Sequence, residues 1–516
     1  MWLLCTLCIS VVFVRLAAHN LANFRPVSND EVELIAVAYK LATRGILGSD
    51  MYVGFFGGDE HHFETLPLQH VLDAAAFRVF GAGILQARLV SLLAGASIVW
   101  TAGWLAYRWY GPGTALLCEL LLVAWPSDLT AASGGLPLLG VARTARYDVL
   151  AVAAVWLAIL LVDVTLRRPG PRRALATGVC CGLAALAQFF GSFVLPLVPA
   201  IWLRSRPRTL TLLAAWLAGL ALVMSPYVVL AARHPADLAG QLSVFGNRGD
   251  FLRPGFYVDN VLSEWTRYAH LAPVSFSTWL LCVGPAPAAL GLARRGRPGD
   301  RVLLASLAIF AAALALLDQT KVPLYSVLLV PSICLVLAAG ASAFLGWARR
   351  GGRPIWPGVA AGVVALGMLG VGLDGLDAYR LDWDAATRVT PYLAFGQQIR
   401  AAIPAGSVVL GPERWWWALH EHRYLSLRSL WFQWSAAAAA AQEPPHFADW
   451  VRRAQADRVI VNINVRADVN AFPDALQAQF WDFLERCTTR VADLDDPTYF
   501  ETEVYALLDP PPEACG

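Results

Sequence analysis

Three short stretches place charged residues beside long apolar segments of the chain. Asp30 and Glu31 lie in SNDEVELIAVAYKLATRGIL, directly after an apolar opening segment. Arg143 and Arg146 lie in GVARTARYDVL, and Lys321 lies in LLDQTKVPLYSVLL. A carboxylate can take a proton from a hydroxyl group, and a guanidinium presents a planar fork to phosphate oxygens. These residue types therefore indicate proton transfer and phosphate binding.

The composition is that of a polytopic membrane protein. Hydrophobic residues make up 57% of the 516 residues and charged residues only 15%, whereas soluble domains average about 45 to 50% and about 25%. The net charge is +2, and the chain has no basic tail or acidic block. We therefore expect membrane lipids around the protein and no nucleic-acid partner.

Eleven apolar runs are candidate transmembrane segments. They lie near residues 1–18, 84–106, 113–131, 147–166, 174–187, 189–203, 209–231, 273–293, 302–318, 322–347 and 355–373. All four arginine clusters, at 167–173, 204–208, 294–301 and 349–353, face the cytoplasm if the N-terminus does too. This orientation predicts a membrane domain over 1–373 and an extracytoplasmic domain over 374–516.

The first run could instead be a cleaved signal peptide, because it is short and Arg15 interrupts it. It has no basic segment at its start and no convincing cleavage site before His19. We therefore expect an uncleaved membrane anchor.

Three segments on the predicted outer side are long or charged, namely 19–83, 132–147 and 232–272. In the first, apolar residues recur with helical spacing and predict an amphipathic helix over 30–43. Asp30 and Glu31 would lie in its first turn, where acids suit the positive end of the helix dipole. A capped interfacial helix is therefore the alternative to a chemical role for these two acids.

The predicted outer-side cations also have a purely structural alternative. Arg146 can pair with Asp148 or extend to lipid headgroups, and Lys321 can pair with Asp318. A cation at the edge of the hydrocarbon costs free energy unless it meets an anion. A bound phosphate would supply that anion.

Several stretches resemble, in order and spacing, the membrane glycosyltransferases of the GT-C superfamily. They are NDEVELIAVAYKLATRGIL, FETLPLQHVLDAAAFRVFGAGILQARLVSLLAG, ARYDVLAVAAVWLAILL, GLAALAQFFGSFVLPLVPAIWL and TKVPLYSVLLVPSICLVLAAG. The nearest branch is that of the bacterial relatives of protein O-mannosyltransferases and of the lipid A aminoarabinose transferase. The resemblance covers about residues 20–345. It implies a long first outer loop at 19–83, an extracytoplasmic active site and a polyprenyl-phosphate-linked sugar donor.

Transferred to this sequence, the resemblance makes Asp30 the catalytic base and Glu31 its neighbour. Arg146 and Lys321 would hold the donor phosphate, with Arg143 as a further candidate. Other residues that could line the site are Tyr325, Asp148 and Gln188. The chain departs from the family pattern at FETLPLQ, where relatives often have paired prolines, and at SGGLPLLGVARTAR, which is longer than usual. The second departure leaves the choice between Arg143 and Arg146 open.

The implied reaction is an inverting glycosyl transfer, with hexose or pentose as the sugar, in a bacterial-type inner membrane. The acceptor could be a lipid, a glycan or a protein. A flippase or transporter of lipid-linked sugars would also be polytopic, although the chain shows no internal repeat of the kind common in transporters. A third alternative is a non-catalytic subunit that binds a sugar lipid.

No motif requires a cofactor, but a divalent metal is an open alternative. GGDEHHFETLPLQH gathers Asp59, Glu60, His61 and His62, residue types that bind divalent metals. Glu64 and His70 follow in the same stretch. A polar turn without a metal explains this composition equally well, because Gly57 and Gly58 precede it.

The region after residue 373 predicts a small α/β domain. We expect strands near GSVVLG, DRVIVNINV and EVYALL, and helices near 391–403, 446–455 and 472–486. Six alanines at 436–441, followed by QEPP, predict a loop or linker. Trp415, Trp416 and Trp417 could stack on sugars or anchor at the membrane interface. Of the nine cysteines, Cys487 and Cys515 lie outside the predicted spans and are candidates for a disulfide.

Overall fold

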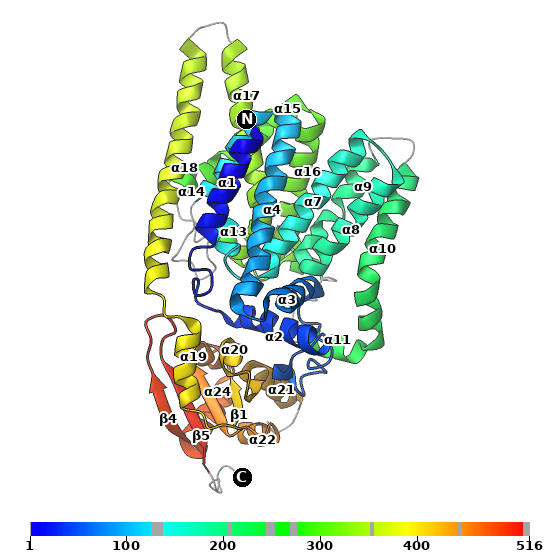
Figure 1. The fold of residues 1–516 in the computed structure, drawn as a ribbon. Coiled ribbons are helices and arrows are strands. Elements are labelled where there is room, and N and C mark those ends of the chain that lie inside the picture. The colour runs from blue at the N-terminus through cyan, green and yellow to red at the C-terminus, as the bar shows by residue number, and fades with distance from the viewer. Residues whose placement is uncertain are drawn as a thin grey trace. The chain divides into compact units, whose positions relative to one another are not determined.

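The computed structural model describes residues 2–125, 138–203, 209–243, 253–268, 276–350, 355–440 and 446–508. The chain forms two compact units (Figure 1). The first, called the helical unit, comprises Met1–His19, Arg88–Leu230 and Gly246–Ala385. The second, called the sheet unit, comprises Asn20–Ala87, Ala231–Phe245 and Ala386–Gly516. The segment 20–83 therefore belongs to the sheet unit.

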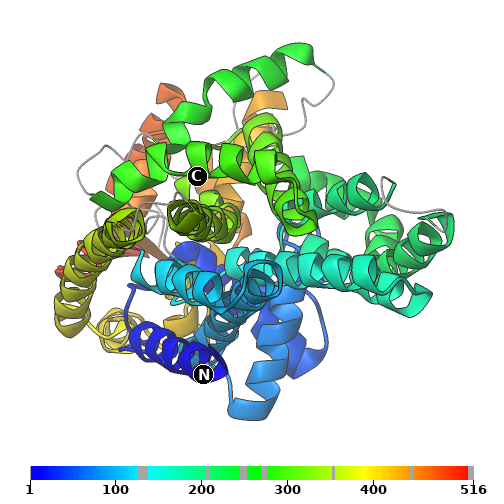
Figure 2. The same cartoon turned by 90° about the horizontal axis from the view of Figure 1, so that it is seen from above.

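The helical unit is built from the apolar runs of the sequence. Its elements are α1 (Trp2–Ala17), α4 (Ile84–Tyr110), α5 (Pro112–Ala124), α6 (Leu138–Val141), α7 (Tyr147–Arg167), α8 (Pro171–Ala187), η2 (Phe189–Val194), α9 (Leu197–Trp202), α10 (Thr209–Arg233), α12 (Pro254–Leu262), α13 (Glu264–Tyr268), α14 (Phe276–Val283), α15 (Pro285–Arg295), α16 (Pro298–Leu317), η5 (Pro323–Leu328), α17 (Val330–Arg350) and α18 (Ile355–Arg388). The last or first few residues of α4, α10 and α18 are assigned to the sheet unit. Its long helices lie side by side (Figure 1), and Figure 2 views most of them roughly end-on.

Each of the eleven predicted runs contains helix, but not every run is one long helix. Within the described residues, six helices are long and apolar enough to cross a membrane: α4, α7, α10, α16, α17 and α18. The run at 273–293 is divided between α14 and α15, because Pro285 begins a new helix after Gly284. The structure thus confirms a mostly helical protein with several helices that are candidates for membrane spans, while eleven crossings stay a prediction.

Helices α8 and α10 approach each other at glycine. A Cβ atom at Gly178 of α8 would lie 1.9 Å from the backbone oxygen of Trp216, and one at Gly219 of α10 would lie 2.1 Å from that of Leu175. No side chain fits at either position. Close packing through small residues is the usual way in which apolar helices associate in a bilayer.

The sheet unit contains a mixed five-stranded sheet with strand order β2-β1-β3-β5-β4. The strands are β1 (Val408–Gly411), β2 (Arg423–Ser426), β3 (Arg458–Asn462), β4 (Thr488–Leu494) and β5 (Thr502–Leu507). β1 pairs in parallel with β2 and β3, whereas β5 pairs antiparallel with β3 and β4. The helices of this unit are α2 (Asn29–Arg44), α3 (Pro67–Phe80), α11 (Pro235–Ser243), α19 (Tyr392–Ala401), α20 (Trp416–Leu419), α21 (Leu427–Ala440), α22 (Phe447–Arg453), α23 (Ile463–Val469) and α24 (Asp474–Cys487), with short 3-10 turns η1 (Asp50–Tyr52) and η6 (Glu413–Trp415).

The predicted strands correspond to β1, β3 and β5, and the predicted helices to α19, α22 and α24. All six predictions are confirmed. The predicted linker at the alanine run is wrong as far as the structure describes it, because α21 continues to Ala440. Alanine has the highest helix propensity of the amino acids, so this composition favours a helix. Ala441 and the QEPP that follows lie outside the described residues.

The tryptophan cluster lies mainly in a core. Trp415 is fully buried and packs against Tyr392 and Tyr499, with ring centroids 5.7 and 5.3 Å away. Trp415 therefore neither stacks on a sugar nor reaches a membrane surface. Both alternatives that the sequence suggested are wrong for this residue. Trp416 is also buried, whereas Trp417 is partly exposed and stacks on His420. Cys487 is disulfide-bonded, and Cys515, its predicted partner, lies outside the described residues.

Candidate functional site

Helix α2 presents the acidic pair in its first turn, as predicted. Ser28 precedes the helix, and its Oγ accepts a hydrogen bond from the Glu31 backbone N–H at 3.3 Å. Gly45 ends the helix in the left-handed conformation, with φ +73°. The cap is therefore supplied by Ser28. Asp30 is partly exposed and Glu31 is fully buried, so of the two acids Asp30 is the one in contact with solvent.

Helix α2 differs in one respect from the amphipathic helix that the sequence predicts. Every residue from Glu31 to Ala38 is buried, on all sides of the helix. Helix α3 packs against α2, as do η6 and α20 from the region after β1. Because these elements cover its polar face, the charged residues of that face pair inside the sheet unit.

Arg146 immediately precedes α7 in the helical unit. Its Nε donates to Asp148 Oδ2 at 2.7 Å, so the ion pair that the sequence gave as an alternative is present. Its backbone N–H donates to Ser91 Oγ of α4 at 3.1 Å. Asp148 is completely buried, whereas 17% of the Arg146 side chain is exposed. Asp148 therefore orients a guanidinium that keeps contact with solvent.

Arg143 has a different environment. It is fully buried, with Nη1 at 3.2 Å from Asp382 Oδ2 of α18. Nη2 donates to the backbone oxygen of His19 at 2.7 Å. His19 in turn stacks on Trp383, with ring centroids 3.5 Å apart. Arg143 thus joins the end of α1 to α18.

Lys321 belongs to a network of four charged residues in the helical unit, of which three are buried and Glu264 is partly exposed. Its Nζ lies 2.8 Å from Glu264 Oε2 and donates to the backbone oxygen of Ala315 at 2.9 Å. Arg267 pairs with Glu264 at 2.8 Å and with Asp318 at 2.9 Å. Asp318 therefore pairs with Arg267 rather than with Lys321, contrary to the alternative suggested by the sequence. Lys321 has a left-handed backbone, with φ +51°, an uncommon conformation for a non-glycine residue.

Glu264 and Arg267 were not predicted from the sequence. Both lie in the short helix α13, within the segment 232–272 that the sequence marks as charged. Burial favours the neutral form of Glu264, but hydrogen bonds from Arg267 and Lys321 outweigh it and lower the pKa of this carboxyl. The only signal in the sequence was their i, i+3 spacing, which is common in surface ion pairs.

The two remaining candidates for the lining of a site, Gln188 and Tyr325, both adjoin Phe189 in the helical unit. Gln188 is partly exposed between α8 and η2, and its side chain accepts the backbone N–H of Phe189 at 2.8 Å. Tyr325 of η5 packs against Phe189 and Phe190, with ring centroids 6.2 and 5.4 Å away. The structure thus brings Tyr325 to the two residues that follow Gln188.

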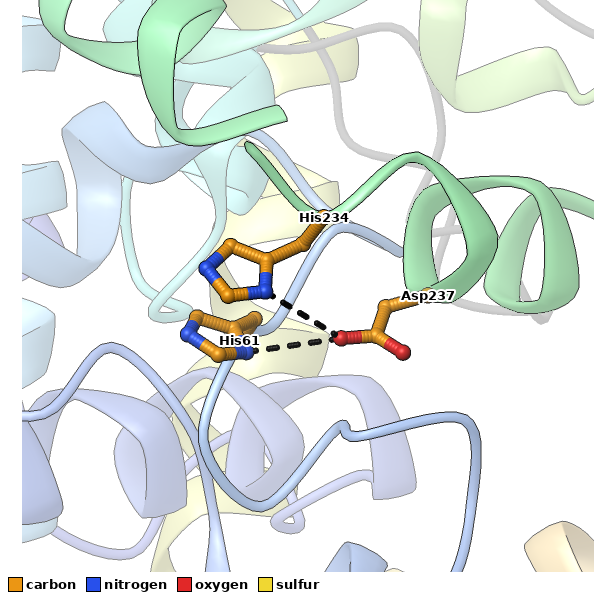
Figure 3. A group of neighbouring side chains, drawn as sticks. All are labelled: His61, His234 and Asp237. Atoms are coloured by element: carbon orange, nitrogen blue, oxygen red, sulfur yellow. Dashed lines mark ion pairs between the residues drawn. The ribbon is translucent and has the colours of Figure 1, made fainter. Parts of the chain in front are cut away.

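The histidine-rich stretch does not converge on one point. The Asp59 backbone oxygen accepts a hydrogen bond from Lys40, and Glu60 is exposed. His62 is buried, and its Nε2 lies 2.9 Å from Thr65 Oγ1. Of the four predicted metal candidates, only His61 belongs to a group of potential metal ligands among the described residues. The other two members of that group are His234 and Asp237 (Figure 3). Neither partner was predicted.

A second unpredicted cluster surrounds Arg428 of α21 in the sheet unit. Its Nη2 lies 3.2 Å from Glu33 Oε2 and 2.9 Å from Glu64 Oε1, and its Nε lies 3.4 Å from Glu413 Oε1. All three carboxylates are almost completely buried. Burial, and next the neighbouring charge of Glu64, raise the pKa of Glu33 well above its usual range, and Arg428 opposes this only in part.

We expect Glu33→Gln to stabilise the protein at high pH. A carboxyl whose pKa is raised in the folded state costs stability once the pH exceeds about 4.3, its unfolded value, and the cost grows until the pH passes the folded pKa. Glutamine removes that cost, and Arg428 keeps its ion pairs with Glu64 and Glu413. The melting temperature of Glu33→Gln should exceed that of the wild type at pH 8 and approach it at pH 5. The exposed Glu485→Gln is the control, and an equal loss of stability at both pH values would contradict the assignment.

His70 of α3 gives the opposite pH dependence. It is buried, with Nε2 at 2.8 Å from Thr65 Oγ1, and burial lowers the pKa of His70 to about 4. The unfolded chain takes up this proton near pH 6.5, so stability is present above that pH and is lost as the pH falls toward 4, by up to about 3 kcal/mol. His70→Gln should flatten thermal melting profiles between pH 7 and pH 4.5. Parallel wild-type and variant profiles would show that His70 does not cause the loss.

Comparison with known proteins identifies the fold. No family model matches the sequence, and neither does any curated protein sequence. Among solved structures, ArnT from Cupriavidus metallidurans bound to undecaprenyl phosphate is similar, with a TM-score of 0.60 and 14% identity over 98% of each chain. The archaeal oligosaccharyltransferase AglB from Archaeoglobus fulgidus, solved with an inhibitory peptide and a dolichol-phosphate, has a TM-score of 0.58 and 12% identity over 96% of this chain and 74% of its own. ArnT is the lipid A aminoarabinose transferase.

The chain therefore shares its fold with these two transferases, one of which belongs to the branch that the sequence resembles. It is a membrane protein with several spanning helices and a small mixed sheet. The similarity extends beyond the 20–345 region on which the sequence resemblance rested, because it covers nearly the whole chain.

Proposed function

We propose that this protein is an inverting glycosyltransferase that uses a polyprenyl-phosphate-linked sugar as donor. The observation that carries the proposal is the fold shared over 98% of both chains with an ArnT structure that holds undecaprenyl phosphate. The acidic pair in the first turn of α2 and the outer-side cations of the sequence agree with it. Following the arginine distribution, the reaction takes place at the outer face of a bacterial inner membrane.

The reaction needs one base and no general acid. The departing polyprenyl phosphate already carries charge, unlike the leaving group of a glycosidase, which needs a second carboxyl to protonate it. Asp30 takes the proton of the acceptor hydroxyl as its oxygen attacks the anomeric carbon and the bond from that carbon to the phosphate oxygen breaks. A single displacement of this kind inverts the anomeric centre. Glu31 is the buried neighbour of Asp30 in the first turn of α2.

Cations at the donor phosphate stabilise the charge that develops on the leaving oxygen. Arg146 suits this role better than Arg143, because its side chain reaches solvent while Asp148 orients it. Arg143 is fully buried between His19 and Asp382. Lys321 is the second cation, and the Glu264 carboxylate fixes the position of its ammonium group.

Donor consumption by the purified protein in detergent tests the function. An enzyme converts polyprenyl-phosphate sugar in the presence of a cell-envelope extract as acceptor, without a sealed membrane. A flippase or transporter leaves the donor chemically unchanged in detergent and moves it only across proteoliposomes. Donor that is bound but never consumed, in detergent and in proteoliposomes alike, would indicate a non-catalytic subunit.

A further inference from the structure

We propose that His61, His234 and Asp237 form a binding site for one divalent transition metal, best matched by zinc. His61 lies in the segment between α2 and α3, His234 follows α10, and Asp237 lies in the first turn of α11. The three potential ligand atoms lie within 4.8 Å of one another. Figure 3 shows both imidazoles turned toward the same carboxylate oxygen.

The distances suit coordination better than hydrogen bonding. His61 Nδ1 lies 3.5 Å from Asp237 Oδ2, and His234 Nδ1 lies 3.7 Å from the same oxygen. Zinc binds nitrogen and oxygen ligands at about 2.0 to 2.1 Å in a tetrahedron, which separates neighbouring ligand atoms by about 3.3 Å. Hydrogen bonds from nitrogen to oxygen usually measure about 2.7 to 3.2 Å. Small side-chain movements would bring the three atoms around an ion.

The hydrogen-bonding state of His61 supports the proposal independently. Its Nδ1 is buried from solvent and has no hydrogen-bond partner. A buried polar atom without a partner is costly, and a bound ion is one of the explanations for such an atom. The imidazoles of His61 and His234 also stack with centroids 3.5 Å apart.

The surrounding structure holds the ligands in place. Gln241 lies one turn after Asp237 in α11 and is completely buried. Its Nε2 donates to the backbone oxygens of His61 at 2.6 Å and Phe56 at 3.0 Å, and its Oε1 accepts the backbone N–H of Phe63 at 2.7 Å. α11 is thus joined to the loop on both sides of His61, so a bound ion would meet ligands that are already positioned.

Gly57 allows the close approach of the Asp237 carboxylate. It has a left-handed backbone, with φ +65°, and a Cβ atom there would lie 2.7 Å from Asp237 Oδ2. The other group of potential ligands in the described residues is Asp493, Glu501 and Glu503. Arg466 and Arg490 already pair with Glu503 there, and exposed carboxylates alone do not define a site.

Two imidazoles and one carboxylate are a ligand set typical of zinc, and of cobalt as its substitute. Three protein ligands leave a fourth position to water. A metal at this point would link the loop between α2 and α3 to α11, and the inference does not depend on the proposed function.

Metal content and cobalt spectroscopy of the full-length protein in detergent test the site. The protein carries an affinity tag without histidine, is stripped with EDTA, and is then titrated with Zn²⁺ or Co²⁺. We expect about one tightly bound zinc ion per chain and, with Co²⁺, the intense visible bands of a tetrahedral site. The His61→Ala, His234→Ala double variant should lose at least about 100-fold in affinity, since two ligands are removed.

His422→Ala is the matched control, because it removes a partly exposed histidine of the same unit that lies outside the ligand group. It should bind zinc as the wild type does. Gel filtration confirms that each variant is folded, and Asp237→Asn provides a milder change if the double variant is not. Wild type that binds no zinc after titration, or equal affinity in the wild type and in the folded ligand variants, would overturn the proposal.

Discussion

Asp30→Asn should reduce sugar transfer by a factor of about 10² to 10⁴, the usual contribution of a general base. Asparagine has nearly the same size and keeps a polar oxygen, but it cannot take the proton of an attacking hydroxyl. The fold should tolerate the change, because Ser28 caps α2 and Asp30 is partly exposed. Donor binding should change little, since the phosphate is assigned to cations.

Asp474→Asn is the matched control for this prediction. Asp474 is also an acid in the first turn of a helix, α24, and it is exposed. The control removes the same favourable interaction with a helix end, without touching the proposed base. Wild-type turnover in Asp30→Asn would exclude Asp30 as the base. A loss of donor binding as large as the loss of turnover would assign Asp30 to the donor site instead.

Lys321→Ala should weaken donor binding by about 10- to 100-fold, because a hydrogen bond to a charged group contributes about 1.5 to 3 kcal/mol. Glu264 loses one partner but keeps Arg267 at 2.8 Å, so the network should survive. Lys321→Arg should retain part of the affinity because it keeps the positive charge. Binding of a labelled polyprenyl phosphate to the detergent-solubilised protein measures each effect.

The chain has only one other lysine, Lys40, which is also buried. It pairs with Asp50 at 2.6 Å and is not assigned to the donor. Lys40→Ala should therefore lower stability while leaving the affinity for polyprenyl phosphate unchanged. If both lysine variants lost affinity together, the effect of Lys321→Ala would reflect stability. If neither did, the donor would be held by other residues.

The features that depend on local sequence could be predicted. Apolar runs located the helices of the helical unit, and helical spacing located α2 with Asp30 in its first turn. Three strands and three helices of the sheet unit were found in the same way. The short strand β2 and the largely exposed strand β4 were missed, because neither has the run of buried apolar residues that marks a strand.

The features that depend on tertiary contacts could not be predicted. Lys321 pairs with Glu264, 57 residues away, and Phe63 pairs with Gln241, 178 residues away. The sequence offered Asp318 as the partner of Lys321 only because it is near in the chain. Glu33 lies within the predicted amphipathic helix, and only the packing of α21 shows that it meets Arg428 in a buried cluster.

The most direct test is the release of polyprenyl phosphate from a panel of polyprenyl-phosphate sugars, with purified wild-type protein beside Asp30→Asn and a cell-envelope extract as acceptor. We predict that the wild type releases polyprenyl phosphate from one donor of the panel and that Asp30→Asn, although it binds that donor, does not. This result would establish the transferase, identify its sugar and locate its base. Release from no donor by the wild type, or equal release by both proteins, would contradict the account.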